Sequence, residues 1–153
     1  MGRFHKFAAC LSAAAMTLVL PVQANAATGA EKVRRLDIML MVTGLRCRNT
    51  PDNFQPDFQR FEASHLTELN QAARTMKSDL AVRYGNAGAA RALDRLSVGM
   101  ANEYGQGHPW LNCAQLKTVA RNLAQARGGA VLEAAADQLL ADSGSPQLAM
   151  VQQ

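Results

Sequence analysis

The chain has 153 residues, of which 48% are hydrophobic and 18% are charged, with a formal net charge of +4 at pH 7. This length suits one domain built around one modest core. The charge is too small to form the dense basic face that nucleic-acid binding requires, so we expect no nucleic-acid partner.

The first 26 residues have the layout of a secretory signal peptide. A basic start with Arg3 and Lys6 precedes the 14-residue apolar stretch FAACLSAAAMTLVL, and an A-x-A site ends at Ala26. A bilayer-spanning helix needs about 20 apolar residues, so this stretch is too short for a retained anchor. We therefore expect cleavage after Ala26, with cleavage after Ala24 as the competing outcome.

Cleavage would release residues 27–153 into an oxidising compartment, which we expect to be the periplasm of a Gram-negative bacterium. Loss of two basic residues leaves 14 basic against 12 acidic residues, a net charge of +2. No later apolar run approaches spanning length, so we expect no membrane insertion after cleavage. We divide the mature chain into a single helical domain, residues 27–142, and a flexible C-terminal tail, residues 143–153.

The first helix of the domain is expected over residues 30–47. Its apolar residues recur at helical spacing, and Thr28 with Glu31 three residues later is typical of a capping box. The segment NTPDNFQP, residues 49–56, is a cluster of turn-forming residues that separates this helix from the next.

A second helical pattern runs over residues 56–84 and ends at Gly85, which we expect to cap the helix in a left-handed conformation. A straight helix of this length would measure about 43 Å, longer than a domain of this size is wide. We therefore expect a bend near Ser78 and Asp79.

Three more helices are expected in the rest of the chain. One covers residues 87–107, one begins after Asn112, which has Gln115 three residues later as a capping partner, and a short one begins at Ala130. No segment alternates polar and apolar residues between hairpin turns, so strands are not indicated. The sequence therefore predicts an all-α bundle of four to five helices.

Two cysteines, Cys47 and Cys113, remain after signal removal. An even pair in an oxidising compartment is most simply a disulfide, and a loop of 66 residues would stabilise the fold by about 4 kcal/mol. Activation of the Cys47 thiolate by Arg46 and Arg48, or metal binding, is less favoured. Redox exchange would need two cysteines separated by two residues, and zinc would need closely spaced pairs of ligands.

The pair Glu62 and His65 forms an E-x-x-H motif on one helical face, but carboxylate-bridged di-iron bundles need two such motifs. His108 lies on a glycine-flanked loop, where functional residues often occur. We therefore treat Glu62, His65 and His108 as candidate ligand or metal residues. The chain contains no G-x-S-x-G motif and no glycine-rich phosphate loop, so we assign no catalytic residue and no cofactor.

The segments RRLDIMLMVTGLRCR, FQRFEASHLTELN and LSVGMANEYG, followed by a late cysteine, resemble those of small secreted helical proteins of alphaproteobacterial type. The resemblance covers most of the mature chain. It implies export and a helical fold, and no catalytic residue carries over from it.

The resulting expectation is a non-enzymatic binding or accessory protein of the cell envelope, with a protein or small-molecule partner. One alternative is a small enzyme or metal-binding protein that uses Glu62, His65 and His108. Another is an envelope stress chaperone that holds clients on an exposed methionine-rich face, formed by Met39, Met41, Met76 and Met100.

Arg83, at the end of the helix expected over 56–84, and Arg91 and Arg95, on the helix expected over 87–107, could form a basic patch. Arg91 and Arg95 are four residues apart, although Asp94 interrupts the patch. We prefer a solvated helix face, with a docking surface for an acidic partner as the alternative.

Overall fold

The computed structural model describes residues 28–140. Within this range the chain forms five helices and no strand: α1 (Gly29–Cys47), α2 (Gln55–Ser64), α3 (Leu66–Glu103), α4 (Cys113–Gln125) and α5 (Gly129–Leu139). The predicted all-α class is confirmed. The expected signal peptide and residues 143–153 of the expected tail lie outside the described range, and no described helix is long and apolar enough to cross a membrane.

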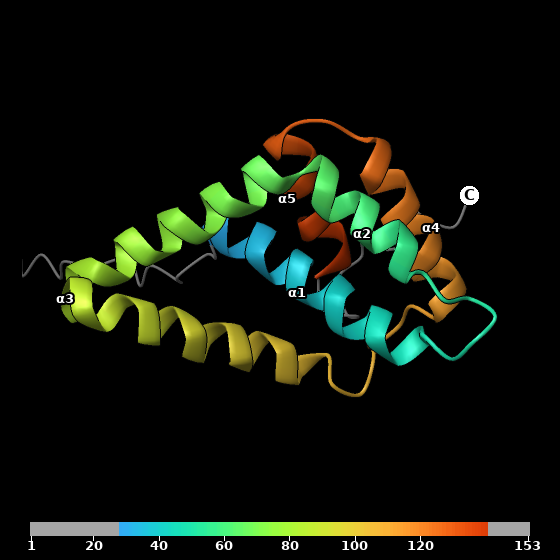
Figure 1. The fold of residues 1–153 in the computed structure, drawn as a ribbon, viewed down its shortest axis with the longest axis horizontal. Helices are drawn as coiled ribbons and strands as arrows, with labels where there is room; N and C mark the ends of the chain where they lie inside the picture. The colour runs from blue at the N-terminus through green and yellow to red at the C-terminus, as the bar shows by residue number, and fades with distance from the viewer. Residues whose placement is uncertain (1–27, 141–153) are drawn as a thin grey trace, which may run out of the picture.

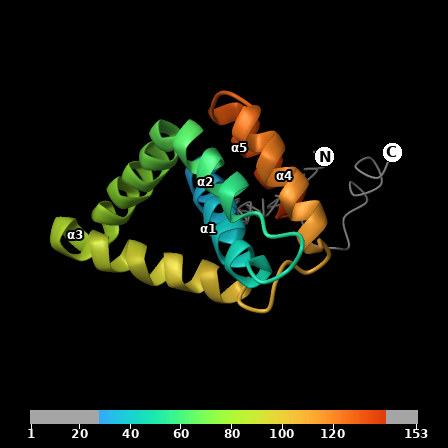
Figure 2. The same cartoon turned by 45° about the vertical axis from the view of Figure 1, so that its right-hand side comes forward.

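Helix α1 lies at the centre of the bundle and packs against each of the other four helices (Figures 1 and 2). Leu36, Met39 and Leu40 are completely buried, together with Phe54 and Phe61 from the segment that follows. A helix surrounded by neighbours must be apolar on more than one face, which explains the continuous run of buried residues in the middle of α1.

Thr28 and Asn112 are the N-caps of α1 and α4 as predicted, although only α4 has both bonds of a capping box. The Thr28 hydroxyl oxygen accepts a hydrogen bond of 3.2 Å from the backbone N–H of Glu31. Asn112 and Gln115 form a complete capping box, in which each side chain accepts from the other residue's backbone N–H, at 3.0 and 2.9 Å. Both helices therefore begin where the local sequence satisfies their first backbone donors.

The prediction of one helix over residues 56–84 with a bend near Ser78 and Asp79 is wrong. The chain breaks at His65, between α2 and α3, and Ser78 and Asp79 lie inside α3. The break coincides with bonds to α4: the Ser64 hydroxyl donates to the Ala124 carbonyl at 3.0 Å, and the adjacent ring of His65 bonds the preceding carbonyl. These partners are about 60 residues away, so local periodicity carried no sign of the break.

Gly85 divides α3 into a first arm, residues 66–84, and a second arm, residues 86–103. Its backbone has φ 67° and ψ 165°, a conformation that essentially only glycine adopts. The helix expected over 87–107 is therefore the second arm of α3, and it ends at Glu103. In Figure 1 the arms run to the left end of the molecule and back, with the bend at that end.

Some apolar residues at helical spacing lie at the surface and not in the core. Leu45 is 47% exposed on α1, and Leu96 is 44% exposed on the second arm of α3. The second arm packs against the body of the bundle through Leu93 and Met100, which contact the cluster of Ile38 and Met76. Helical spacing alone therefore does not identify which face of this arm is buried.

Candidate functional site

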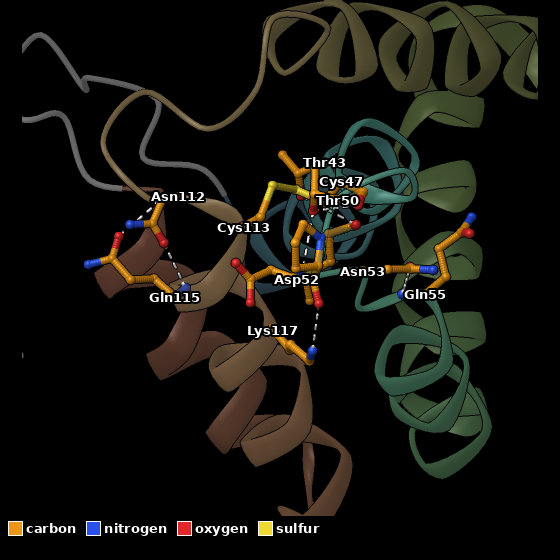
Figure 3. Close-up of a disulfide and its surroundings, with 12 residues drawn as sticks. Thr43, Cys47, Thr50, Asp52, Asn53, Gln55, Asn112, Cys113, Gln115 and Lys117 are labelled. Carbon is orange, nitrogen blue, oxygen red and sulfur yellow. Dashed lines mark hydrogen bonds between the residues drawn. A yellow bond between two sulfur atoms is a disulfide. The ribbon is translucent and has the colours of Figure 1, made fainter.

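Cys47 and Cys113 form a disulfide, which confirms the predicted pairing. Their Cα atoms are 5.7 Å apart, and the bond joins the end of α1 to the start of α4 (Figure 3). Cys47 is 3% exposed. The neighbouring turn is held by the Thr50 hydroxyl, which donates to the Cys47 carbonyl at 2.8 Å. The two sulfur atoms therefore crosslink the bundle and are not available as thiolates.

The arginine before the crosslink also has a structural partner. The Arg46 guanidinium donates to the Gly105 carbonyl at 2.8 Å and so ties the end of α1 to the loop after α3. Arg48, which follows Cys47, is exposed at the C-cap of α1. A cation at this end of a helix is stabilised by the negative end of the helix dipole.

His65 is completely buried at the junction of α2 and α3. Its Nε2 atom lies 2.8 Å from the Leu123 carbonyl. Because a carbonyl only accepts, Nε2 donates this hydrogen bond. Nδ1 has no hydrogen-bond partner, and the nearest carboxylate, that of Glu68, lies 3.9 Å away. His65 thus fastens α4 to the junction and leaves one buried nitrogen facing Glu68.

His108 organises the loop between α3 and α4. Its Nε2 donates to the Leu139 carbonyl at 3.0 Å, and its Nδ1 accepts from the backbone N–H groups of Trp110 and Leu111 at 3.4 and 3.2 Å. Burial lowers the pKa of His108, and the bond to Leu139 partly opposes this effect. Both nitrogens of the neutral ring are therefore occupied by backbone groups.

The predicted candidates Glu62, His65 and His108 are not gathered into one metal site. The two histidines bond carbonyls of different helices, at Leu123 of α4 and Leu139 of α5. Across residues 28–140, no three His, Cys, Asp or Glu side chains are arranged to hold a metal ion. Glu62, on α2, acts instead on Asp37 of α1, whose pKa its negative charge helps to raise.

The four methionines considered for a chaperone surface do not share an exposed face. Met39, Met76 and Met100 are buried, with at most 6% of each residue exposed, whereas Met41 is 40% exposed. Three of them therefore serve as core residues, the usual role of methionine at helical spacing.

A groove of about 660 Å³ lies between the start of α1, the first arm of α3 and the start of α5. Its α3 wall is one continuous stripe, formed by Thr67, Glu68, Gln71, Ala72, Thr75 and Asp79. Opposite this stripe are small residues, Gly29, Ala30 and Gly129, together with Val33, and their short side chains leave the space open.

The groove is acidic. Glu68, Asp79 and Glu133 line it, and no lysine, arginine or histidine does. Glu68 and Asp79 are three helical turns apart on one face, which separates them by about 16 Å along the axis of α3. Ala72 and Val33 provide apolar surface along the wall and floor. A positively charged ligand with an aliphatic middle would match this arrangement of charge and apolar surface.

Glu133 has a structural role as well. Its carboxylate lies directly over Gly29, where a Cβ atom would come within 2.6 Å of Oε1. A carboxylate at the first turn of a helix is stabilised by the positive end of the helix dipole, so Glu133 also holds α5 against α1. Glu68 and Asp79 are the carboxylates on the opposite wall.

Comparison of the chain with protein-family models, curated protein sequences and solved structures gave no match.

Sequence reasoning did not identify this groove. The relevant pattern was the polar stripe beginning at Glu68 and recurring every three or four residues to Asp79, beside the apolar row of the same helix. On its own this pattern indicates a solvated face. Only the approach of Gly29 and Gly129, from two other segments, turns the stripe into a wall.

Proposed function

We propose that this chain is a non-catalytic binding protein of the bacterial cell envelope, which holds a small organic cation in the groove between α1, α3 and α5. The observation that carries the proposal is the carboxylate-bearing stripe of α3, which faces this groove. The engagement of His65 and His108 with backbone carbonyls supports a binding role over acid–base chemistry.

The groove favours a linear diamine or polyamine. Ammonium groups at the two ends of such a molecule would meet Glu68 and Asp79, and its methylene groups would lie along Ala72 and Val33. Thr75 and Gln71 supply oxygen atoms that accept hydrogen bonds from N–H groups. A quaternary ammonium ion has no N–H donor, and no aromatic ring lines the groove to bind it through a cation–π contact.

Isothermal titration calorimetry of the chain from residue 27 onward tests the ligand. Spermidine and 1,8-diaminooctane should bind more tightly than hexylamine, which has one ammonium group. The double variant Glu68→Gln/Asp79→Asn should weaken diamine binding at least tenfold, because each charge-assisted hydrogen bond contributes about 1.5–3 kcal/mol.

Asp94→Asn is the matched control, because Asp94 is an exposed carboxylate on the second arm of α3 and does not line the groove. Diamine affinities that are equal in the wild type and the double variant would contradict the proposal. The envelope location has its own test, intact mass spectrometry of protein from the periplasmic fraction. We expect a mass lacking residues 1–26 and two hydrogen atoms, whereas recovery of the complete chain from the cytoplasm would contradict export.

A further inference from the structure

The bend of α3 carries a basic hollow that the proposed function does not use. This hollow measures about 300 Å³ and is lined by three residues from each arm: Leu80, Arg83 and Tyr84 from the first, and Ala92, Arg95 and Leu96 from the second. Its floor is apolar, and two guanidinium groups and one phenol surround it. No acidic residue lines it.

The basic side chains at the bend have no acidic partners. In the part of the chain that the structure describes, Lys77, Arg83, Arg91 and Arg95 make no ion pair; the paired bases are on α1, α2 and α4. A second hollow of about 350 Å³, also formed by both arms, contains Arg74 and Lys77 and again no acid. Asp94, exposed next to Arg95, offsets part of this charge but lines neither hollow. The remaining excess of basic side chains makes the bend an anion-attracting surface.

Exposed apolar side chains lie among these bases. Val82 is 91% exposed, Tyr84 is 47% exposed and Leu96 is 44% exposed. The guanidinium of Arg83 lies 5.7 Å from the centre of the Tyr84 ring. Exposed tyrosine and aliphatic side chains among arginines are the combination found where proteins meet the headgroup region of a bilayer.

The shape of the bend favours a flat partner. Figures 1 and 2 show it projecting from the bundle, away from α2 and α4, with no other described helix covering it. A stable protein interface needs about 800 Å² on each side, with large side chains buried at its centre. The bend instead offers a few exposed apolar side chains separated by cations. A bilayer can supply a phosphate to each arginine without a fixed register.

We infer that the bend of α3 docks on the surface of an anionic lipid bilayer. In this arrangement Arg83, Arg91 and Arg95 contact lipid phosphates, while Val82 and Tyr84 enter the headgroup layer. The helices do not cross the bilayer. The groove uses the same arm of α3 together with α1 and α5, and Asp79 at its end directly precedes Leu80, but no residue that lines the groove lines either hollow.

Cosedimentation with lipid vesicles tests the inference, using the chain from residue 27 onward so that the signal peptide cannot anchor it. We expect binding to vesicles made of equal parts phosphatidylglycerol and phosphatidylcholine, little binding to pure phosphatidylcholine, and release by high salt. The double variant Arg83→Gln/Arg95→Gln should lower the partition coefficient about thirtyfold. Adding Val82→Ser to this double variant should lower the partition coefficient further.

The matched control is Arg48→Gln/Arg127→Gln, which removes the same charge at exposed positions far from the bend. It should bind anionic vesicles nearly as the wild type does. Circular dichroism of all variants should be unchanged, because the substituted side chains are exposed. Equal binding to both vesicle types, or equal losses in the two double variants, would overturn the inference. Binding to polyglutamate through Arg83 and Arg95, without binding to vesicles, would overturn it in favour of an acidic protein partner.

Discussion

Asp37 is a carboxyl group that the fold buries inside α1 with incomplete compensation. Arg34 pairs with it at 3.2 Å, but its Oδ1 atom has no partner. Burial raises the pKa of Asp37 to about 6; Arg34 opposes the shift and Glu62 adds to it. Between about pH 4 and pH 6, Asp37 is therefore largely protonated in the folded chain and largely ionised in the unfolded chain. The stability that protonated Asp37 contributes is fully present below about pH 3.9, the pKa of this side chain in the unfolded state. It is lost as pH rises through about 6, its pKa in the folded state.

The substitution Asp37→Asn should relieve this cost at neutral pH. The free energy of unfolding of the variant minus that of the wild type should be up to about 3 kcal/mol larger at pH 8 than at pH 4. Two pKa units correspond to about that energy. Urea denaturation at both pH values measures the gain. Asp94→Asn, at an exposed position, should show no such pH-dependent difference. A gain of equal size for both variants would argue against a raised pKa at Asp37.

At the scale of the element, α3 shows how one residue sets the shape of a long helix. Its 38 residues would form a rod of about 57 Å if straight. Gly85 folds the rod into two arms, which brings Arg83 and Arg95 into one hollow and lets Met100 reach Ile38 and Met76 in the core. The tolerance of glycine for positive φ is thus what places the second arm beside α1.

Gly85→Ala should destabilise the protein by about 1–3 kcal/mol, because a Cβ atom is strained at φ 67° and ψ 165° even though no neighbour lies within 4 Å. Gly99→Ala is the control within the same element, since this glycine lies in helical conformation with open space around it. That change should stabilise by about 0.5–1 kcal/mol. Chemical denaturation of the two variants gives the comparison, and a Gly85→Ala protein as stable as Gly99→Ala would refute the strain at the bend.

At the scale of the whole molecule, two kinds of contact join α4 to the rest of the fold. At one end the disulfide attaches the start of α4 to α1. At the other end the carbonyls of Leu123 and Ala124 bond His65 and Ser64 at the junction of α2 and α3. The covalent bond closes a loop that includes α2 and α3, so it constrains more than half of the described chain.

Reduction of the disulfide should lower the free energy of unfolding by about 4 kcal/mol, mainly because the unfolded chain regains the entropy of an open loop. Urea unfolding with and without a thiol reductant measures the change. Cys47→Ala/Cys113→Ala should start from the lower stability and show no response to the reductant. A wild-type unfolding midpoint unaffected by complete reduction would count against a stabilising crosslink.

The sequence by itself determined the all-α class, the caps at Thr28 and Asn112, and the pairing of Cys47 with Cys113. Capping acts over three residues, helical periodicity over a few turns, and the two cysteines that the expected signal cleavage would leave can pair in only one way. The tertiary structure decided the break at His65, the groove and the two hollows at the bend. His65 depends on a carbonyl at Leu123, and the groove on three segments that meet only in the folded chain. Interactions within one turn of helix depend only on neighbouring residues, so the sequence shows them. A surface formed by distant segments exists only once packing has brought those segments together.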